Sequence, residues 1–345
     1  MLKVNLGGIA LAVGAIMLSC LGAEIFARSS GYRPNQPVEL SPDEKASREE
    51  EAFAKPDPEM GWVNRGGWTR SVEPGHVIMN FLPDGRRYDP LGNKGDDKPK
   101  ILVVGCSFTQ GYGVTDTETY AHLVNADLPE AEVLNFGTGG YSTYQSLLRI
   151  RSYFSPRAAS PTPLVIYGLI GNHQSRNVAA ADWVLAVGIP PHVRIVEGRM
   201  IELPQGSISP WHLENQSALS VMAHRAALKA MFSVPDEEQH DALRRLVETM
   251  DNTVRGNRSS LLVVGLMNVP SWFAEWAANH NINYVDCVDP GLAEHDPSLQ
   301  VGGTGAHPSA LLHRRYAQCV LKALVARGFA PANAQLPSPE PANEQ

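Results

Sequence analysis

The stretch ILVVGCSFTQGYGV, residues 101–114, joins a buried strand to two small nucleophilic side chains. Its first four residues, Ile101 to Val104, form a continuous apolar run, which is typical of a parallel strand covered on both faces. Cys106 and Ser107 follow directly after Gly105, where the strand is expected to end. Because open parallel sheets bind ligands beyond the carboxyl ends of their strands, Ser107 is a candidate functional residue. The alternative is a tight turn in which the serine only caps the chain.

Similar apolar runs recur along the chain, and segments with helical spacing separate them. The runs cover residues 101–104, 131–134, 164–169, 261–266 and 282–285, and helical patterns fill 120–128 and 143–154. This alternation predicts an α/β fold: a three-layer α/β/α domain with a five-stranded parallel sheet of flavodoxin-like character. The connection between the third and fourth runs is too long for a simple crossover. We interpret residues 180–235 as an insertion with a hairpin and a helix near 215–231.

Two further glycine-bearing polar turns follow the second and third runs, at residues 135–140 and 171–173. The carboxyl ends of parallel strands meet at one edge of a sheet, so these turns are expected to lie beside residues 105–107. Three such turns at one edge indicate a site.

A serine nucleophile at this site needs a base, and the best candidate is His307. Pro308 suits the first position of a helix that runs to about residue 328, which would place His307 at the helix N-terminus. The partial positive charge there would keep the imidazole neutral, as a base requires. His313, further along this helix, is expected at the surface or in packing.

The composition excludes several function classes. The formal net charge is -7 and the Lys and Arg residues are scattered, so no nucleic-acid partner is expected. The histidines and the four cysteines show no metal-ligand spacing, so no metal and no cofactor is predicted. Cys20 lies in an apolar leader, and the three other cysteines leave room for one disulfide but not for a disulfide framework.

The leader, residues 1–28, is informative about location. Val4 to Ala23 carry no charge over 20 residues, which as a helix is about 30 Å and enough to cross a bilayer. We expect an uncleaved signal anchor, a transmembrane helix, because no good small-residue cleavage site precedes Glu24. A cleaved signal peptide and a lipidated Cys20 are the alternatives. The anchor and the lipidated cysteine would attach the chain to a membrane, and the cleaved signal peptide would export it. All three predict that the main domain is extracytoplasmic, which means periplasmic in a Gram-negative cell.

The other boundaries follow composition. Residues 29–74 are polar and rich in turn residues, and we interpret them as a stalk and an irregular lead-in. A capping box at Ser41 predicts a short acidic helix to about Ala54. The main domain is expected over residues 75–328, and the tail at 329–345, rich in Pro, Ala, Asn and Glu, is expected to be disordered.

Together these stretches resemble the SGNH (GDSL-like) hydrolase family over roughly residues 75–328. VVGCSFTQGYGV is similar to the nucleophile block, which implies that Ser107 is the nucleophile and that its N–H is an oxyanion donor. LNFGTGGYSTYQ and IYGLIGNHQSRN resemble the next two blocks, which implies that the N–H of Gly140 and the side chain of Asn172 complete the oxyanion hole. AHPSALLHRRYA resembles the last block, with His307 as the base. The leader followed by IFARSSGYRP looks like membrane-tethered bacterial members.

Three positions depart from the family pattern. Cys106 stands where an Asp usually precedes the serine; we expect it to pack inward, and a reactive Cys106 thiolate is the alternative nucleophile. His173 stands where an Asp usually follows Asn172. Gly305 and Thr304 occupy the positions of the acid that normally orients the catalytic histidine.

Losing the function of that acid can cost about 10⁴ in rate in a triad, because the imidazole loses its orientation. A backbone carbonyl, the Thr304 hydroxyl, or the carboxylate of Asp296 or Asp289 would be its replacement. We therefore expect a Ser–His dyad in an extracytoplasmic esterase that acts through an acyl-serine on O-acyl groups of envelope glycans or lipids. An SGNH-like protein that only binds a glycan or an assembly partner, and an O-acyltransferase, are the alternatives.

Overall fold

The computed structural model describes residues 6–35, 52–72, 77–92, 94–95, 97–155, 161–292, 294–301, 307–331 and 334. The chain divides into two compact units. The first comprises Met1–Glu51, Ala180–Ile189 and Gly206–Val234, and the second comprises Ala52–Ala179, Pro190–Gln205 and Pro235–Gln345.

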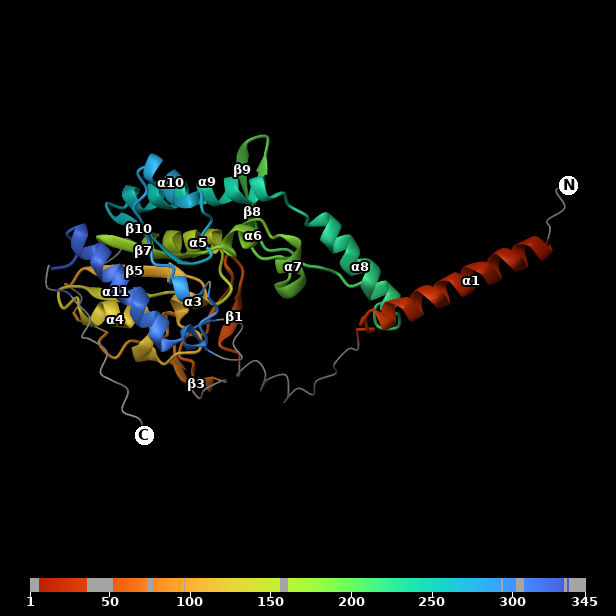
Figure 1. Ribbon diagram of the computed structural model, residues 1–345, viewed down its shortest axis with the longest axis horizontal. Coiled ribbons are helices and arrows are strands. Elements are labelled where there is room, and N and C mark those ends of the chain that lie inside the picture. The colour runs from red at the N-terminus through yellow and green to blue at the C-terminus, as the bar shows by residue number, and fades with distance from the viewer. Residues whose placement is uncertain are drawn as a thin grey trace. The chain divides into compact units, whose positions relative to one another are not determined.

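A five-stranded parallel sheet forms the centre of the second unit (Figure 1). Its strands are β5 (Lys100–Gly105), β6 (Glu132–Asn135), β7 (Leu164–Ile170), β10 (Ser260–Met267) and β11 (Tyr284–Asp286). The order across the sheet is β11, β10, β7, β5, β6. Numbered along the chain this is the order 2-1-3-4-5 of flavodoxin-like folds. The predicted fold class is confirmed, and each apolar run of the sequence contributes one strand.

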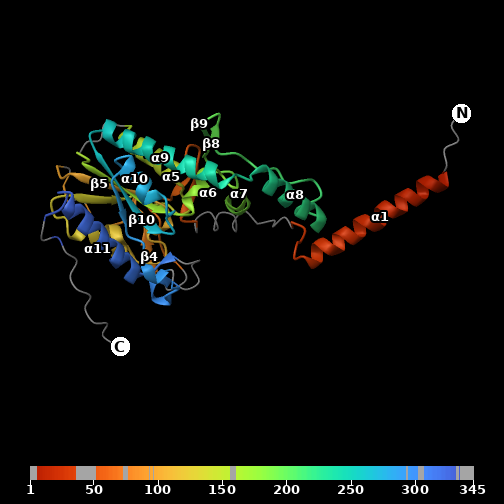
Figure 2. The same cartoon turned by 45° about the horizontal axis from the view of Figure 1, so that its top comes forward.

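Helices cover both faces of this sheet, as Figure 1 and the turned view in Figure 2 show. Ile101 and Val103 of β5 share a buried cluster with apolar residues of α4 and α11. Leu102 and Val104 alternate with them and are equally buried, so they point to the opposite face, where α5 contacts β5. Burial on both faces explains the continuous apolar run. The helices are α4 (Tyr120–Ala126), α5 (Thr143–Phe154), α9 (Asp236–Gly256), α10 (Phe273–Asn279) and α11 (Ala310–Ala326).

The second unit begins before the boundary at residue 75 that the sequence predicts. Two antiparallel pairs precede the sheet: β1 (Ala54–Asp57) with β2 (Gly61–Asn64), and β3 (Thr69–Val72) with β4 (Val77–Asn80). Trp68, Met79 and Phe81 form a small buried cluster against which Tyr112 packs, so these residues belong to the fold. Residues 54–57 are a strand and not the end of the predicted acidic helix, most of whose range lies outside the described residues.

The predicted insertion is divided between the two units. Its hairpin belongs to the second unit and consists of β8 (His192–Val196) and β9 (Arg199–Leu203). Glu197 and Gly198 form the two-residue turn with φ of 50° and 72°, as the type I′ hairpin geometry requires. The remainder, with α7 (Ala181–Val187) and α8 (Ala218–Met231), belongs to the first unit.

The first unit also contains α1 (Leu6–Ser29), the helix formed by the apolar leader. Among the described residues, Gly7–Ser29 is the single helix long and apolar enough to cross a membrane. α8 contacts both α1 and α7.

One disulfide joins Cys287, just after β11, to Cys319 in α11. The sequence left room for one such bridge, and Cys20 and Cys106 remain as free thiols. Beyond α11, Phe329 and Ala334 pack against the main core cluster, so the start of the tail is ordered against the fold. Residues 335–345 of the predicted disordered tail lie outside the described residues.

Candidate active site

Ser107 is the first residue of α3 (Ser107–Gln110), which follows β5 directly. Gly105 allows the sharp turn: its φ is 155°, and a Cβ there would lie 2.3 Å from Thr109 Oγ1 and 3.0 Å from the carbonyl oxygen of Gly168. Cys106 is fully buried in the core cluster, so the second nucleophile of the pair is withdrawn from the surface. Ser107 is 8% exposed.

His307 lies at hydrogen-bonding distance from Ser107, 200 residues away in the chain. Its Nε2 is 2.8 Å from Ser107 Oγ. His307 belongs to β13 (His307–Pro308), which pairs antiparallel with β12 (Gln300–Val301). The short strand pair therefore presents the imidazole to the serine.

The prediction that Pro308 begins the last helix is wrong. α11 begins at Ala310, and the Ser309 hydroxyl caps it by accepting a hydrogen bond from the N–H of Leu312 (3.4 Å). A serine N-cap satisfies a free N–H of the first turn, and Pro308 fits instead into the strand pair. His307 therefore lies in a strand and not at the first turn of the helix.

Two aromatic rings contact the His307 imidazole. The ring centroids of Phe108 and Tyr112 lie 5.7 Å and 4.9 Å from that of His307. Phe108 is buried and follows the serine in α3, so the helix that positions the nucleophile also packs against the base. These contacts restrict rotation of the imidazole.

The turn after β6 packs directly on α3. The N–H of Thr138 donates to the carbonyl of Gly105 (3.0 Å), and a Cβ on Gly137 would lie 2.2 Å from the backbone nitrogen of Gln110. Gly140 ends this turn with a φ of 78°, a conformation that favours glycine. The turn that carries the second predicted donor is thus seated against the turn that carries Ser107.

Trp62 of the lead-in holds the peptide bond between Gly139 and Gly140. Its indole Nε1 donates to the carbonyl of Gly139 (2.8 Å). Because that carbonyl and the N–H of Gly140 belong to one planar peptide unit, the hydrogen bond fixes the direction of the N–H. The sequence reasoning assigned Trp62 to an irregular segment and missed this contact.

Asn172 stands just beyond β7, the strand next to β5, and precedes α6 (His173–Asn177). It is exposed, and within the described part of the chain its side-chain amide makes no hydrogen bond, so its N–H groups can donate to a ligand. Gly171 allows the close approach of this turn to β10, since a Cβ there would lie 2.1 Å from the carbonyl oxygen of Asn268.

His173 is fully buried and ties α6 to the start of α5. Its Nδ1 lies 2.6 Å from the hydroxyl of Tyr167, which donates to Thr143 Oγ1 (2.7 Å). Asn177 Nδ2 donates to the same Thr143 oxygen (3.1 Å). Burial, with a smaller effect from Arg176, holds the pKa of His173 well below its usual range, so this histidine is neutral.

A second set of bonds joins the same elements. Arg176 Nη1 donates to the carbonyl of Tyr141 (3.2 Å), and the N–H of Tyr144 donates to Asn177 Oδ1 (3.2 Å). The turn with Gly140 and the helix that follows Asn172 are therefore held in fixed relation. Sequence reasoning missed these partners, although a tyrosine inside an apolar run signals a buried hydroxyl that needs one.

Two of the proposed replacements for the missing acid are bonded to other residues, and Thr304 lies outside the described residues. Asp289 Oδ2 pairs with Arg315 Nη1 (2.8 Å), and its Oδ1 accepts from the N–H of Gly291 (3.0 Å). Asp296 Oδ1 accepts from the N–H (2.9 Å) and hydroxyl (2.7 Å) of Ser298. The Asp296 carboxylate serves a local turn, whereas the Asp289 carboxylate bonds both a local turn and α11. Thr304 is not among the described residues.

A buried arginine supports the loop after α3. Arg87 pairs with Asp116 (2.5 Å) and donates to the carbonyls of Gln110 (3.0 Å), Gly111 (3.0 Å) and Val114 (2.8 Å). Burial lowers the pKa of Arg87, and Asp116 opposes this effect. This loop carries Tyr112, so Arg87 supports one of the two rings that contact His307. No local pattern in the sequence indicates this role of Arg87.

His313 is a packing residue. It is fully buried in α11, and its Nδ1 accepts from the N–H of Tyr120 (3.2 Å). Burial lowers its pKa to about 3, so it is neutral. Of the two outcomes that the sequence allowed for this residue, packing is the one observed.

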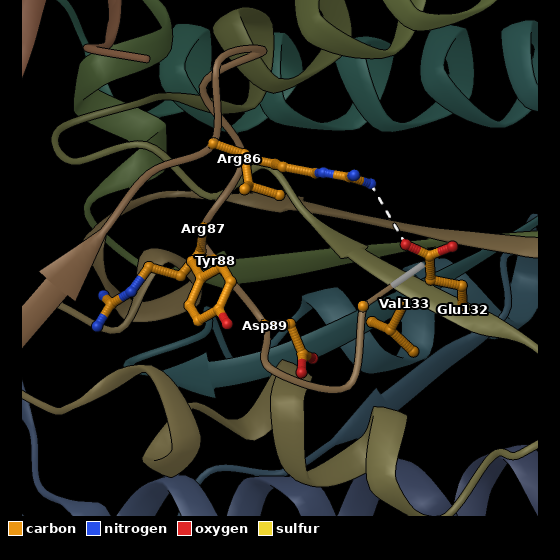
Figure 3. A pocket seen from close by; sticks show the side chains of 8 residues that line it. Arg86, Arg87, Tyr88, Asp89, Glu132 and Val133 are labelled. Carbon is orange, nitrogen blue, oxygen red and sulfur yellow. Dashed lines mark hydrogen bonds and ion pairs between the residues drawn. The ribbon is translucent and has the colours of Figure 1, made fainter. Parts of the chain in front are cut away.

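A separate pocket of about 200 Å³ lies beside the start of β6 (Figure 3). Its lining includes Arg86, whose Nη1 lies 3.5 Å from Glu132 Oε1, and Asp89, which is bonded to His122 (2.8 Å). Figure 3 shows Arg87 directed away from Glu132. None of the predicted catalytic residues lines this pocket, so it is not the candidate active site. Among the described residues, no group of three His, Cys, Asp or Glu could hold a metal ion.

No family model and no curated protein sequence matches this chain. Solved structures do. A member of the lipolytic G-D-S-L family from Veillonella parvula matches at 13% identity and a TM-score of 0.35, over 65% of this chain and 97% of that one. A putative lipolytic G-D-S-L protein from Desulfitobacterium hafniense matches at 14% identity and a TM-score of 0.39, over 66% and 100%.

An acetylxylan esterase from Geobacillus stearothermophilus, solved as a catalytic mutant, matches at 16% identity and a TM-score of 0.37, over 67% of this chain and 96% of that one. At these identities and scores the functional argument rests on the residues of this chain alone.

Proposed function

We propose that this chain is a serine ester hydrolase that acts through an acyl-serine intermediate. The observation that carries the proposal is the 2.8 Å distance between His307 Nε2 and Ser107 Oγ. A serine is a weak nucleophile until a base removes its proton, and this is the geometry in which a histidine does so. Ser107 is held in the short helix α3 and His307 in the short strand β13, and two aromatic rings contact the imidazole.

In the proposed reaction, Ser107 Oγ attacks the acyl carbon while His307 Nε2 takes the hydroxyl proton. The resulting oxyanion accepts hydrogen bonds from the N–H of Ser107, the N–H of Gly140 and the amide of Asn172. Each donor of this kind is typically worth about 10² to 10³ in turnover. The intermediate collapses as His307 returns the proton to the leaving alcohol, and water then cleaves the acyl-serine by the same path in reverse.

Orientation of the imidazole is proposed to come from packing. In a triad the acid holds the ring in position and stabilises its protonated form. Here the pairing of β13 with β12 and the rings of Phe108 and Tyr112 would supply the positional part. The Thr304 hydroxyl and a backbone carbonyl remain the proposed partners of Nδ1.

An extracytoplasmic location is supported by the Cys287–Cys319 disulfide, since such bridges persist in oxidising compartments and are rare in the cytosol. The apolar helix α1 supports a location of the same chain at a membrane. We propose that the substrate is an O-acyl group on an envelope glycan or lipid. Acetylated glycans should release acetate on incubation with the protein, and a panel that releases none would count against this substrate class.

The reaction itself is tested with a simple activated ester such as p-nitrophenyl acetate. Ser107→Ala should reduce turnover to the uncatalysed background, whereas Cys106→Ala should keep the turnover of the wild type. The reverse result would make the thiol the nucleophile. Product analysis with an added sugar acceptor separates hydrolysis from acyl transfer, and a folded protein inactive on every ester would support the binding alternative.

A further inference from the structure

The first unit contains a contact that attaches one of its loops to the end of α1. The Glu24 carboxylate accepts hydrogen bonds from the N–H of Ala218 (3.1 Å), the N–H of Leu219 (2.9 Å) and the hydroxyl of Ser217 (2.8 Å). α8 begins at Ala218, so a side chain of α1 caps the first turn of α8. The leader is therefore an integral part of this unit.

A second contact holds the same loop on the other side of the last turn of α1. The N–H of Asn35 donates to the carbonyl of Glu214 (2.7 Å), and its side-chain amide donates to Glu214 Oε2 (2.7 Å). Ala27, between these two attachment points, is fully buried. Residues 211–217, the docking loop, are thus fixed at the C-terminal end of α1.

The position of Glu24 sets the level of the docking loop relative to a bilayer. Val4 to Ala23 are uncharged and Glu24 is the next residue. The apolar part of α1, from Leu6 to Ala23, spans about 27 Å at about 1.5 Å per residue, close to the thickness of the hydrocarbon core. Where α1 crosses a membrane, Glu24 therefore lies at the hydrocarbon boundary, and Ser217, which is bonded to it, lies at the same depth.

The docking loop presents large apolar side chains at this level. Trp211 is 46% exposed and Leu213 is 59% exposed. The loop is ordered beneath them: the Trp211 ring stacks on that of His224 with a centroid distance of 5.0 Å, and the backbone N–H of Trp211 donates to Glu214 Oε1 (3.2 Å). Tryptophan is enriched at membrane–water interfaces because its ring is apolar and its N–H is polar.

We propose that α1 is retained in the mature protein and that the docking loop lies in the lipid headgroup layer, with Trp211 and Leu213 inserted. The partner is a lipid surface, and the first unit is the part of the protein that rests on it. This proposal depends on α1 crossing a membrane and is independent of the esterase proposal. It selects the uncleaved anchor among the three interpretations of the leader, because a mature chain that begins at Cys20 or later lacks the apolar part of α1 that sets the depth of the docking loop.

Retention is tested by intact mass of the full chain purified from membranes. A mature protein that still contains residues 1–28 is expected. A mature N-terminus at Cys20 or at any later residue would overturn the proposal.

Docking is tested with the full chain in nanodiscs of phosphatidylcholine and phosphatidylglycerol. In a Cys20→Ser background, Leu213→Cys carries an environment-sensitive fluorophore, and Ala226→Cys, an exposed position on α8, is the matched control. The label at 213 should be quenched more strongly by spin-labelled lipid than by aqueous iodide, and the label at 226 less so. Equal lipid quenching at both positions, or none at 213, would contradict insertion of the loop.

The attachment is tested by removing the cap. Glu24→Ala should reduce lipid quenching at position 213, whereas Asp182→Ala, which removes an exposed acid of α7 in the same unit, should not. Quenching that survives Glu24→Ala unchanged would mean that Glu24 does not set the depth of the loop.

Discussion

Gly105 is the residue on which the position of Ser107 depends. A methyl group there would lie 2.3 Å from Thr109 Oγ1, and an alanine would have to adopt the φ of 155° that Gly105 has. We expect Gly105→Ala to lower the free energy of unfolding by about 2 kcal/mol or more, from strain and overpacking together. Gly256→Ala is the control, since nothing lies within 4 Å of that position. Denaturant unfolding measures both, and equal stability of the two variants would contradict the tight turn.

The buried neutral histidines predict a fall in stability in acid. His313 has a pKa of about 3 and that of His173 is well below its usual range, whereas both take up a proton below about pH 6.5 in the unfolded chain. The unfolded state then binds more protons, so the free energy of unfolding should decrease by about 1.4 kcal/mol per pH unit for each histidine below that pH. Urea unfolding at several pH values should show a shallower slope for His313→Asn and the original slope for the exposed His280→Asn.

The proximity of Ser107 and His307 could be predicted because each stands in a distinctive sequence context. Ser107 follows an apolar run and a glycine, and His307 stands between a glycine-rich stretch and a proline. Their supporting residues could not be predicted. Trp62, His173 and Arg87 act through partners that are distant in sequence, and nothing local distinguishes a tryptophan that holds a peptide from one that fills a core.

At the scale of elements, the hairpin of β1 and β2 is predicted to tune catalysis. Trp62→Phe keeps the ring but removes the hydrogen bond to Gly139, leaving the peptide that carries the Gly140 N–H free to rotate. We expect kcat to fall by about tenfold, less than the 10² to 10³ for a lost donor, with little change in KM. Trp68→Phe is the control, because the Trp68 indole N–H has no partner among the described residues. Equal kcat values for the two variants would mean that the Trp62 hydrogen bond does not contribute to catalysis.

The disulfide should stabilise the segment that leads to His307. Cys287 and Cys319 close a loop with a sequence separation of 32 residues. Loop-closure entropy for this length corresponds to about 3 to 4 kcal/mol. We expect the Cys287→Ala, Cys319→Ala double variant to lose about that much in denaturant unfolding. The untreated and reduced wild type provide the comparison, and a double variant as stable as the oxidised protein would contradict the prediction.

Burial on both faces gives β5, β7 and β10 continuous apolar runs, so these strands were predictable, and α5 was predictable from its apolar spacing. The pairs β1–β2 and β12–β13 were not, because strands of four and two residues are too short to show a period. The start of α11 was misplaced since proline and serine both suit a helix start, and local sequence does not decide between them.

At the scale of the whole molecule, the sequence indicated an insertion but not the compact unit to which each of its parts belongs. Residues 206–234 are joined to α1 through Glu24 and Glu214, whereas the hairpin at 192–203 belongs with the sheet. The association with α1 depends on hydrogen bonds between residues that are nearly two hundred positions apart in the sequence. The composition of the segment does not predict such bonds. The lead-in was assigned to a stalk for a similar reason: its few apolar residues reveal a core only when Trp68, Met79 and Phe81 meet.

The central claim is that His307 activates Ser107, and labelling by a fluorophosphonate tests it without a choice of substrate. The wild-type full chain should be labelled at Ser107, Ser107→Ala should not be labelled, and His307→Ala should be labelled far more slowly. A folded wild-type protein that is not labelled, or a His307→Ala variant labelled at the wild-type rate, would contradict the dyad.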